Sequence, residues 1–188
     1  MRLVYDEEVK GEVWMEEEFP QIRYFKEWGI YYLNDYKTLV MGGAYSVDKW
    51  IRLQEDLPWF PSEQLTKEEM EECYQQTKDE YFDLVLTHTC PFSWLPTDLF
   101  VHGIAQSKID NTMEKWFEKM KYAIKWNVWL FGHFHEDRVE RPHVELCFME
   151  MKPLEDIMER WSKFDEGHEL KWWIPKGLSY YMEDIWKA

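Results

Sequence analysis

The chain has 188 residues, enough for one domain with a sizeable core, and 45% of them are apolar, which excludes a wholly disordered protein. Its 22 lysines and arginines are outnumbered by 37 aspartates and glutamates, and the net charge of −15 is spread along the chain. This charge opposes nonspecific binding to nucleic acid and to an anionic membrane surface.

The cysteines and the first residues indicate a cellular compartment. Cys73, Cys90 and Cys147 are widely separated and lack the paired spacings of a disulfide framework or a zinc knuckle. The start of the chain has no apolar run typical of a secretion signal, and no stretch reads as a membrane span. We therefore expect a cytoplasmic protein without a membrane segment.

The first half of the chain predicts a hairpin and a helix. Residues 1–29 are rich in acidic and aromatic side chains without a firm period, and we interpret them as loop with short irregular elements. Apolar runs at 30–33 and 38–41, separated by a polar break at 34–36, are typical of two strands joined by a tight turn. Thr66 and Glu69 have the spacing of a capping box, which predicts a helix from there to about Asp79.

The second half alternates strands and helices. Short apolar runs at 83–87 and 128–131 predict buried strands. Between them, behind an Asn111 to Glu114 cap, apolar residues recur three and four positions apart and predict an amphipathic helix. These residues are Met113, Trp116, Phe117, Met120 and Ile124. A final half-buried strand (Val144, Leu146, Phe148) and a third helix (Leu154, Ile157, Met158, Trp161) follow, and the alternation favours an α/β layered fold.

Three histidines stand directly after predicted strands, where ligands bind in α/β sheets. His88 follows the first strand, and His133 and His135 follow the second within Gly132-His133-Phe134-His135. Neutral imidazole binds Zn, Mn or Fe, and Gly132 permits a turn that directs both rings to one side. A single histidine at a strand end is most often structural, but two such ends, one of them His-x-His, favour a metal site.

The two histidine motifs carry a resemblance to a known family. Gly132-His133-Phe134-His135, preceded by Thr87-His88-Thr89-Cys90-Pro91, resembles the closing motifs of calcineurin-like metallophosphoesterases. The block from Gly42 to Lys49, with Arg52 and the stretch 59–64, is similar to a bacterial and phage branch of that family. The resemblance covers about residues 31–155.

The resemblance implies an α/β fold in which a β-sandwich is flanked by helices in αββα layers. Residues 1–188 would form a single domain with an irregular segment 1–29, a family core 30–150, and a C-terminal helix and tail 151–188. It also implies metal-dependent hydrolysis of phosphate mono- or diesters. His88 and His133 would bind the second metal and His135 the first, while Asp48 and Arg52 would lie near the substrate.

The sequence departs from the family at its earlier motifs. Asp-x-His, Gly-Asp-x-x-Asp and Gly-Asn-His followed by Glu or Asp do not occur, so the chain resembles a truncated C-terminal portion. Without the bridging carboxylate, two cations would repel each other at short range. We therefore expect a divalent metal (Mn, Zn or Fe) to be sub-stoichiometric or absent in this chain alone, although three histidines and a water can hold one zinc ion.

Two functions stay open at this point. The chain is either a metallophosphoesterase whose missing half is supplied by another polypeptide segment, or a catalytically inactive truncated fold that acts as an acidic protein-binding or inhibitor module. In both cases the absent strands would leave a sheet edge open. We therefore expect a homodimer or a partner protein that covers this edge.

Overall fold

The computed structural model describes residues 1–100 and 109–167. The chain divides into two compact units, Met1–Lys152 and Pro153–Ala188. Within its described residues, the first unit holds one sheet of three strands and one of six. The expected single domain over residues 1–188 stays a prediction.

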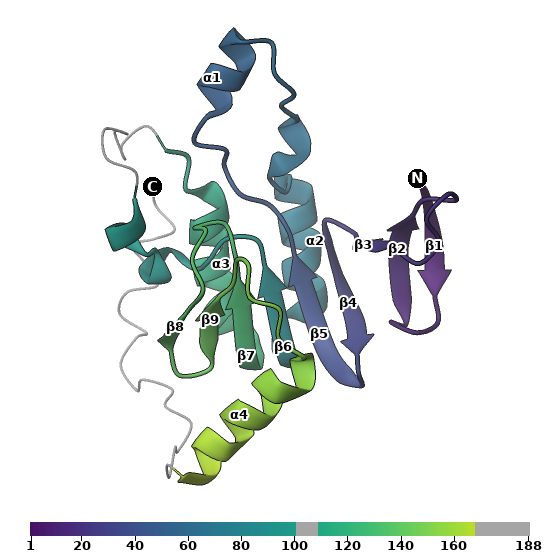
Figure 1. Cartoon of the computed structure of the whole chain (residues 1–188), viewed down its shortest axis with the longest axis vertical. Helices are drawn as coiled ribbons and strands as arrows, with labels where there is room; N and C mark the ends of the chain where they lie inside the picture. Colours follow the sequence, from purple (N-terminus) through teal and green to yellow (C-terminus); the bar gives the residue numbers. More distant parts are fainter. Residues whose placement is uncertain (101–108, 168–188) are drawn as a thin grey trace. The chain divides into compact units, whose positions relative to one another are not determined.

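The larger sheet has the strand order β4-β5-β6-β7-β9-β8 (Figure 1). Its strands are β4 (Trp28–Leu33), β5 (Tyr36–Met41), β6 (Tyr81–Thr87), β7 (Lys125–Phe131), β8 (Arg138–Arg141) and β9 (Val144–Leu146). Strands β5, β6, β7 and β9 are parallel, whereas β4 and β8 pair antiparallel at the two edges. The carboxyl ends of the parallel strands therefore meet at one edge, and the expected α/β class is confirmed. The finer αββα assignment stays a prediction.

The predicted hairpin is β4 and β5, and its turn explains why it forms. Asn34 and Asp35 have φ angles of 48° and 65°. Two consecutive residues with positive φ between antiparallel strands are typical of a type I′ turn, whose twist matches that of the strands. Asn and Asp tolerate this conformation better than most residues.

Two helices, α2 (Lys67–Thr77) and α3 (Thr112–Ala123), pack on one face of this sheet. The start of α2 is confirmed as a capping box, because Thr66 Oγ1 accepts from the Glu69 N–H at 3.1 Å and Glu69 accepts from the Thr66 N–H at 2.7 Å. The start of α3 differs from the prediction. Asn111 makes no capping hydrogen bond, and Asp110 accepts from the Thr112 N–H at 2.8 Å instead.

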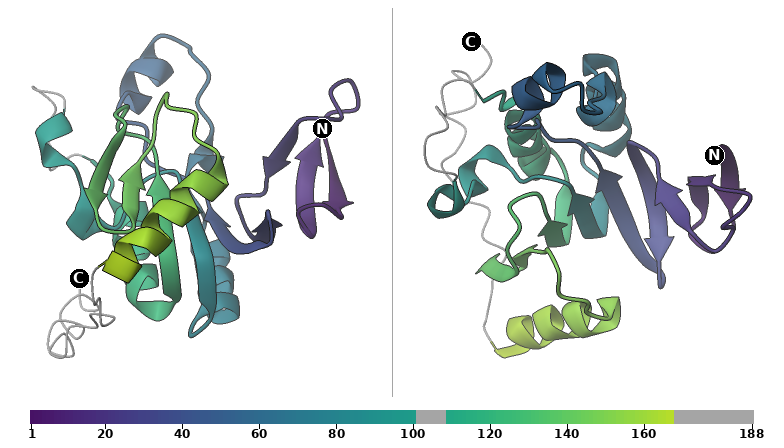
Figure 2. Two further views of the ribbon diagram at one scale, coloured as in Figure 1. Left: turned by 60° about the horizontal axis from the view of Figure 1, so that its bottom comes forward. Right: turned by 45° about the horizontal axis from the view of Figure 1, so that its top comes forward.

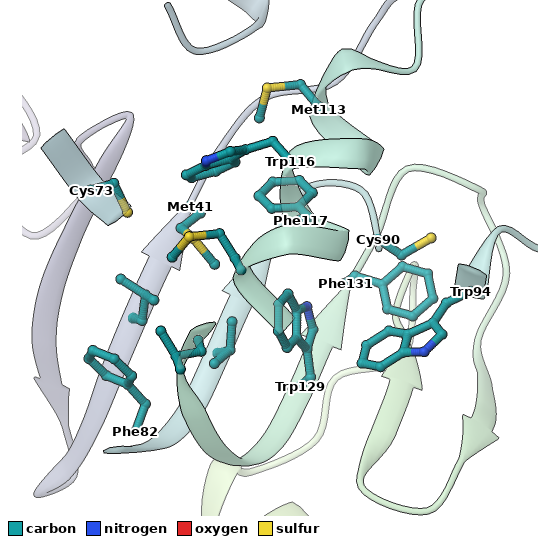
Figure 3. Close-up of a cluster of buried hydrophobic side chains, with 14 of the residues drawn as sticks. Met41, Cys73, Phe82, Cys90, Trp94, Met113, Trp116, Phe117, Trp129 and Phe131 are labelled. Atoms are coloured by element: carbon teal, nitrogen blue, oxygen red, sulfur yellow. The ribbon is translucent and has the colours of Figure 1, made fainter. Parts of the chain in front are cut away.

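The main core lies between these two helices and the sheet (Figure 3). The predicted stripe of α3 is confirmed, with Met113 and Phe117 fully buried in the same cluster as Met41 and Trp129 of the strands. Trp94 contacts Trp129 edge to face at 5.4 Å between ring centroids. Such contacts stabilise a core by more than the burial of their apolar area alone. The core under α2 and α3 therefore holds the ends of the strands in fixed positions.

The expectation of irregular loop for residues 1–29 is wrong. They form the strands β1 (Arg2–Asp6), β2 (Gly11–Met15) and β3 (Arg23–Phe25), paired antiparallel in that order. The strands are short, and large side chains such as Leu3 and Tyr5 lie on the exposed face. The alternation that would reveal the strands is therefore hidden, because apolar residues occupy both faces.

Tyr31 of β4 joins the small sheet to the large one. Its ring packs with Val13 of β2 and Val40 of β5, and its hydroxyl donates to the Glu12 carbonyl at 2.8 Å. Gly11 lies directly against this ring, since a Cβ at that position would be 2.6 Å from Tyr31 Cδ1. Because Val40 alternates with core residues Leu39 and Met41, the small sheet packs on the face opposite α2 and α3.

The connections that follow the parallel strands lie at or beyond the carboxyl edge of these strands. After β5 the chain forms the short helix α1 (Lys49–Gln54), which the sequence did not predict and which lies near the start of α2 (Figures 1 and 2). The three-residue turns η1 (Pro61–Glu63), η2 (Phe92–Trp94) and η3 (Thr97–Leu99) are also part of these connections.

The predicted half-buried strand over 144–148 is wrong in detail. Strand β9 is buried throughout, and Phe148 lies outside this strand and is exposed.

The described part of the second unit is the helix α4 (Leu154–Gly167), which confirms the third predicted helix. The rest of the expected C-terminal tail, residues 168–188, lies outside the described residues. None of the helices within residues 1–100 and 109–167 has the length and apolar character needed to cross a membrane.

Candidate functional site

The ends of β6 and β7 bring two of the predicted histidines together. Thr87 and Phe131, the last residues of these strands, are register partners in the parallel pair. One step further, the Gly132 N–H donates to the His88 carbonyl at 3.0 Å, so the ladder continues past both strand ends. His88 and His133 therefore leave the sheet side by side, as expected for residues that follow neighbouring parallel strands.

The turn after β7 is made by the histidines themselves and not by the glycine. His133 and His135 have φ angles of 73° and 56°, whereas Gly132 does not have a positive φ. The Phe134 N–H donates to the Gly132 carbonyl at 3.0 Å across His133, which is the pattern of a γ-turn in its rarer, positive-φ form. The expectation that Gly132 provides the turn is wrong. A non-glycine residue in this region costs about 1–3 kcal/mol, and such strain concentrates at functional sites.

His88 and His133 are in direct contact. His133 Nδ1 lies 3.2 Å from His88 Nε2, and the two rings meet edge to face with centroids 5.1 Å apart. One of these nitrogens carries the shared proton and the other accepts it, so the contact requires neutral or singly protonated rings. His88 is exposed and His133 half-buried, which leaves the pair accessible at the sheet edge.

The environment keeps both rings uncharged. Desolvation by the surrounding protein, together with charge repulsion from the nearby His88 and His135, lowers the pKa of His133 to about 4. Desolvation and His135 also lower the pKa of His88. Both imidazoles are therefore neutral at physiological pH, which is the form that coordinates a metal ion.

His135 lies at the same edge but makes a different contact. Its ring stacks on Phe148 with centroids 4.7 Å apart and an angle of 18° between planes. Its electrostatic effect on His88 and His133 indicates proximity, although no hydrogen bond joins it to either ring among the described residues. Phe134, between the two histidines, meets Phe131 edge to face with ring centroids 6.3 Å apart, and this contact anchors the turn to the core.

Asp137 is a residue that sequence reasoning missed. The Asp137 carboxylate accepts hydrogen bonds from three consecutive backbone amides, those of Phe148 (2.7 Å), Met149 (2.9 Å) and Glu150 (3.1 Å). These bonds lower the pKa of Asp137. The carboxylate thus fixes the loop after β9, and this loop carries the ring on which His135 stacks.

Arg138 also has a structural role. Its guanidinium binds both oxygens of Asp98, at 2.6 and 3.0 Å, and also pairs with Glu140. The Asp98 and Glu140 carboxylates raise the pKa of Arg138. The edge strand β8 is therefore tied to the η3 turn after β6 by a bidentate contact, a geometry that fixes orientation well.

The predicted substrate-side residues, Asp48 and Arg52, bind each other. Arg52 Nε donates to Asp48 Oδ2 at 2.8 Å, and Arg52 Nη1 donates to the Pro58 carbonyl at 3.3 Å. The Asp48 carboxylate raises the pKa of Arg52. No hydrogen bond or ion pair among the described residues connects this pair to the three histidines, so their place near a substrate stays a prediction.

A buried carboxyl group lies behind the histidine edge. Glu114 of α3 is only 5% exposed, and burial raises the pKa of its side chain. Thr89, directly after His88, is fully buried and lowers that pKa slightly, yet Thr89 Oγ1 and Glu114 Oε2 both lack a hydrogen-bond partner of good geometry within the described structure. Sequence reasoning placed Glu114 in a cap, and nothing in the sequence marked it as buried.

The spacing of the His88 and His133 nitrogens fits two ligands of one metal ion. Nitrogens bound to a tetrahedral zinc ion at about 2.0–2.1 Å each would be about 3.4 Å apart, close to the 3.2 Å observed. Across residues 1–100 and 109–167, however, no group of three or more His, Cys, Asp or Glu side chains has the arrangement of a metal site. The geometry thus supports a pair of ligands, and a direct role of His135 stays a prediction.

Comparison with known proteins adds no relative. No protein-family model, curated protein or solved structure matches the chain.

Proposed function

We propose that this chain supplies the imidazole ligands of a metal-dependent phosphoester hydrolase of the calcineurin-like kind. The observation that supports this most directly is the His88–His133 pair, with Nε2 and Nδ1 3.2 Å apart at the carboxyl ends of adjacent parallel strands. A pair of neutral rings that is open to solvent can offer two lone pairs to one ion, provided that the ring that donates the hydrogen bond changes tautomer, so that its proton moves through solvent to its other nitrogen.

The residues of the chain have distinct roles in this proposal. His88 and His133 hold one divalent ion, and His135 stands beside them, oriented by its stack on Phe148. Asp137 keeps that stack in place through the loop after β9. When bound, a divalent ion polarises a phosphoryl oxygen and lowers the pKa of a coordinated water.

The proposal also requires carboxylate ligands from another polypeptide segment. Two close cations need anionic ligands between them, and the candidate ligands of this chain are neutral imidazoles. The chain alone is therefore proposed to bind metal weakly, and phosphoester hydrolysis is proposed to require the complementary segment with its Asp and Asn ligands.

The positive φ angles in the site limit which substitutions can test it. His133 and His135 have positive φ, so alanine would strain the turn as well as remove the ring. Asparagine tolerates this conformation, and the informative variants are His133→Asn and His135→Asn. His143 has a φ of 64° as well, and His143→Asn is the matched control.

Zinc and manganese binding by calorimetry is the first measurement. We expect His133→Asn to weaken binding at least tenfold and His143→Asn to leave it unchanged. The second measurement is hydrolysis of bis(4-nitrophenyl) phosphate and 4-nitrophenyl phosphate by the chain alone and by the chain co-expressed with polypeptides encoded beside it. Equal metal affinity in all variants, together with no metal-dependent hydrolysis in either preparation, would overturn the proposal.

The His88–His133 contact also favours a second function, that of a catalytically inactive binding module. The His88–His133 hydrogen bond satisfies both rings without a metal. In that case His133→Asn lowers the stability of the fold, whereas metal affinity is equally weak in the wild type and the variant. Thermal unfolding measured with zinc and with a chelator separates the two functions, because only a metal site gives a higher Tm with zinc.

A further inference from the structure

A cluster of large apolar side chains is exposed on the segment that follows β5. It comprises Val47, Trp50, Ile51, Leu53, Leu57 and Phe60, and we call it the 47–60 surface. Trp50, Phe60 and Leu53 are 65%, 62% and 58% exposed, and the helix α1 in this segment buries none of its residues. Single exposed apolar residues are ordinary, but a concentration of them within one short segment marks an interaction site.

Contacts within this segment fix its own shape, while its large apolar side chains stay exposed. Arg52 joins the start of the helix to the return of the chain, through Asp48 at 2.8 Å and the Pro58 carbonyl at 3.3 Å. Lys49 Nζ lies 4.0 Å from the centre of the Trp59 ring. A six-residue helix is not stable through its own hydrogen bonds. These contacts therefore keep the segment ordered, with its apolar side chains exposed.

The charges around the 47–60 surface select the kind of partner. Its two basic side chains, Lys49 and Arg52, are engaged within the segment. Exposed acidic residues follow closely, Glu55 and Asp56 in the segment itself and Glu68 in the first turn of α2, which begins at the end of the sheet where α1 lies (Figures 1 and 2). An apolar centre with an acidic border is complementary to an apolar segment bordered by lysine or arginine.

The same charges disfavour the other two occupants of an apolar surface. A second copy of this chain also carries a net charge of −15, so association through this acidic border would be opposed by repulsion. An anionic membrane surface is repelled for the same reason. A basic protein partner is the occupant that both the apolar and the charged features fit.

We propose that the 47–60 surface docks an apolar segment of another protein that is flanked by lysine or arginine side chains. Docking covers Trp50, Leu53 and Phe60, and the acidic border steers and orients the partner. This inference is independent of the proposed hydrolysis, because it involves none of the three histidines.

A designed peptide tests the docking surface directly. The probe is an amphipathic helix with leucines on one face and lysines on its flanks, and its counterpart has the same leucines with glutamates in place of the lysines. We expect the lysine peptide alone to bind, and we expect Trp50→Ser combined with Leu53→Ser to weaken its affinity at least tenfold. Salt at about 0.5 M should weaken binding to the wild type, because it screens the acidic border.

The control removes exposed apolar groups elsewhere in the same unit. Leu3→Ser combined with Tyr5→Ser changes two exposed side chains of β1, and peptide affinity should stay as in the wild type. Equal affinity of the Trp50/Leu53 variant and the wild type, or no binding up to about 1 mM peptide, overturns the proposal. So does a variant-sensitive dimer in sedimentation, or variant-sensitive binding to phosphatidylserine vesicles, each of which would assign the surface to a different occupant.

Discussion

His133 Nδ1 and His88 Nε2 lie 3.2 Å apart although the residues are 45 positions apart in the chain. The contact exists because β6 and β7 are neighbours in the sheet and end in register. Two protonated rings cannot occupy this position, since both nitrogens would then be donors.

The first prediction concerns the titration of this pair. We expect the NMR signals of His133 to titrate near pH 4, well below the 6.5 of a free imidazole, because the ring is desolvated and lies beside two other histidines. His88 should also titrate below 6.5. An ordinary titration midpoint for both rings would show that the pair is not formed in solution.

The lowered pKa of His133 has a consequence for stability, which is the second prediction. The unfolded chain takes up this proton below pH 6.5 and the folded chain only near pH 4, so His133 stabilises the fold above pH 6.5 and this contribution is lost as the pH falls toward 4. Urea unfolding across that window should therefore show a shallower loss of stability for His133→Asn than for the wild type. Carboxyl groups titrate in both proteins, so the difference between the two curves isolates the ring.

The third prediction concerns Asp137. Asp137→Ala should remove the acceptor for the amides of Phe148, Met149 and Glu150, and hydrogen exchange at these amides should become faster. Because the loop then no longer holds Phe148 against His135, nuclear Overhauser contacts between these rings should weaken. Asp137→Asn, which keeps one acceptor oxygen, should have a smaller effect. Unchanged exchange in the alanine variant would contradict the anchoring role.

The fourth prediction concerns the buried carboxyl of Glu114. Glu114→Gln keeps the shape of the side chain and removes an ionisation that burial disfavours, so we expect a gain of about 0.5–1.5 kcal/mol in unfolding free energy at neutral pH. The raised pKa means that the wild type becomes more stable as the pH falls through it, so the gain should shrink in acid. A destabilised Gln variant would instead show that the ionised carboxylate is required.

The fifth prediction concerns Gly11. A Cβ at this position would lie 2.6 Å from Tyr31 Cδ1 and 2.7 Å from Cε1, so Gly11→Ala must displace the ring that joins the two sheets. We expect a loss of about 1–3 kcal/mol in unfolding free energy. Combining it with Tyr31→Leu should give much less than the sum of the two single effects, because the clash is then gone.

Local signals in the sequence predicted much of the fold. The Asn34-Asp35 turn, the Thr66 capping box and the α3 stripe each depend on residues a few positions apart, and all three are confirmed. The small sheet was missed because apolar side chains such as Leu3 and Tyr5 lie on its exposed face, while the burial of Val13 on the other face depends on Tyr31 of another strand. The edge strand β8 was missed for a similar reason, since Arg138 is positioned by Asp98 from a different connection.

The candidate site followed the same division. That His88 and His133 stand at strand ends was readable from apolar runs, but their contact depends on β6 and β7 being adjacent and in register. The Asp137 anchor could not be predicted, because its partners are backbone amides 11 to 13 positions later, and their N–H groups converge on one carboxylate only in the folded loop.

The position of Tyr31 bears on the order in which the chain acquires structure. Tyr31 and Glu12 are 19 residues apart, and the β4–β5 hairpin closes through a two-residue turn. Residues 1–41 can therefore form the antiparallel pairs β1–β2, β2–β3 and β4–β5 through short loops, before β6 is available for the slower parallel pairing. We expect these antiparallel pairs to form before the parallel ones, with β5 as the strand on which the rest of the large sheet is added.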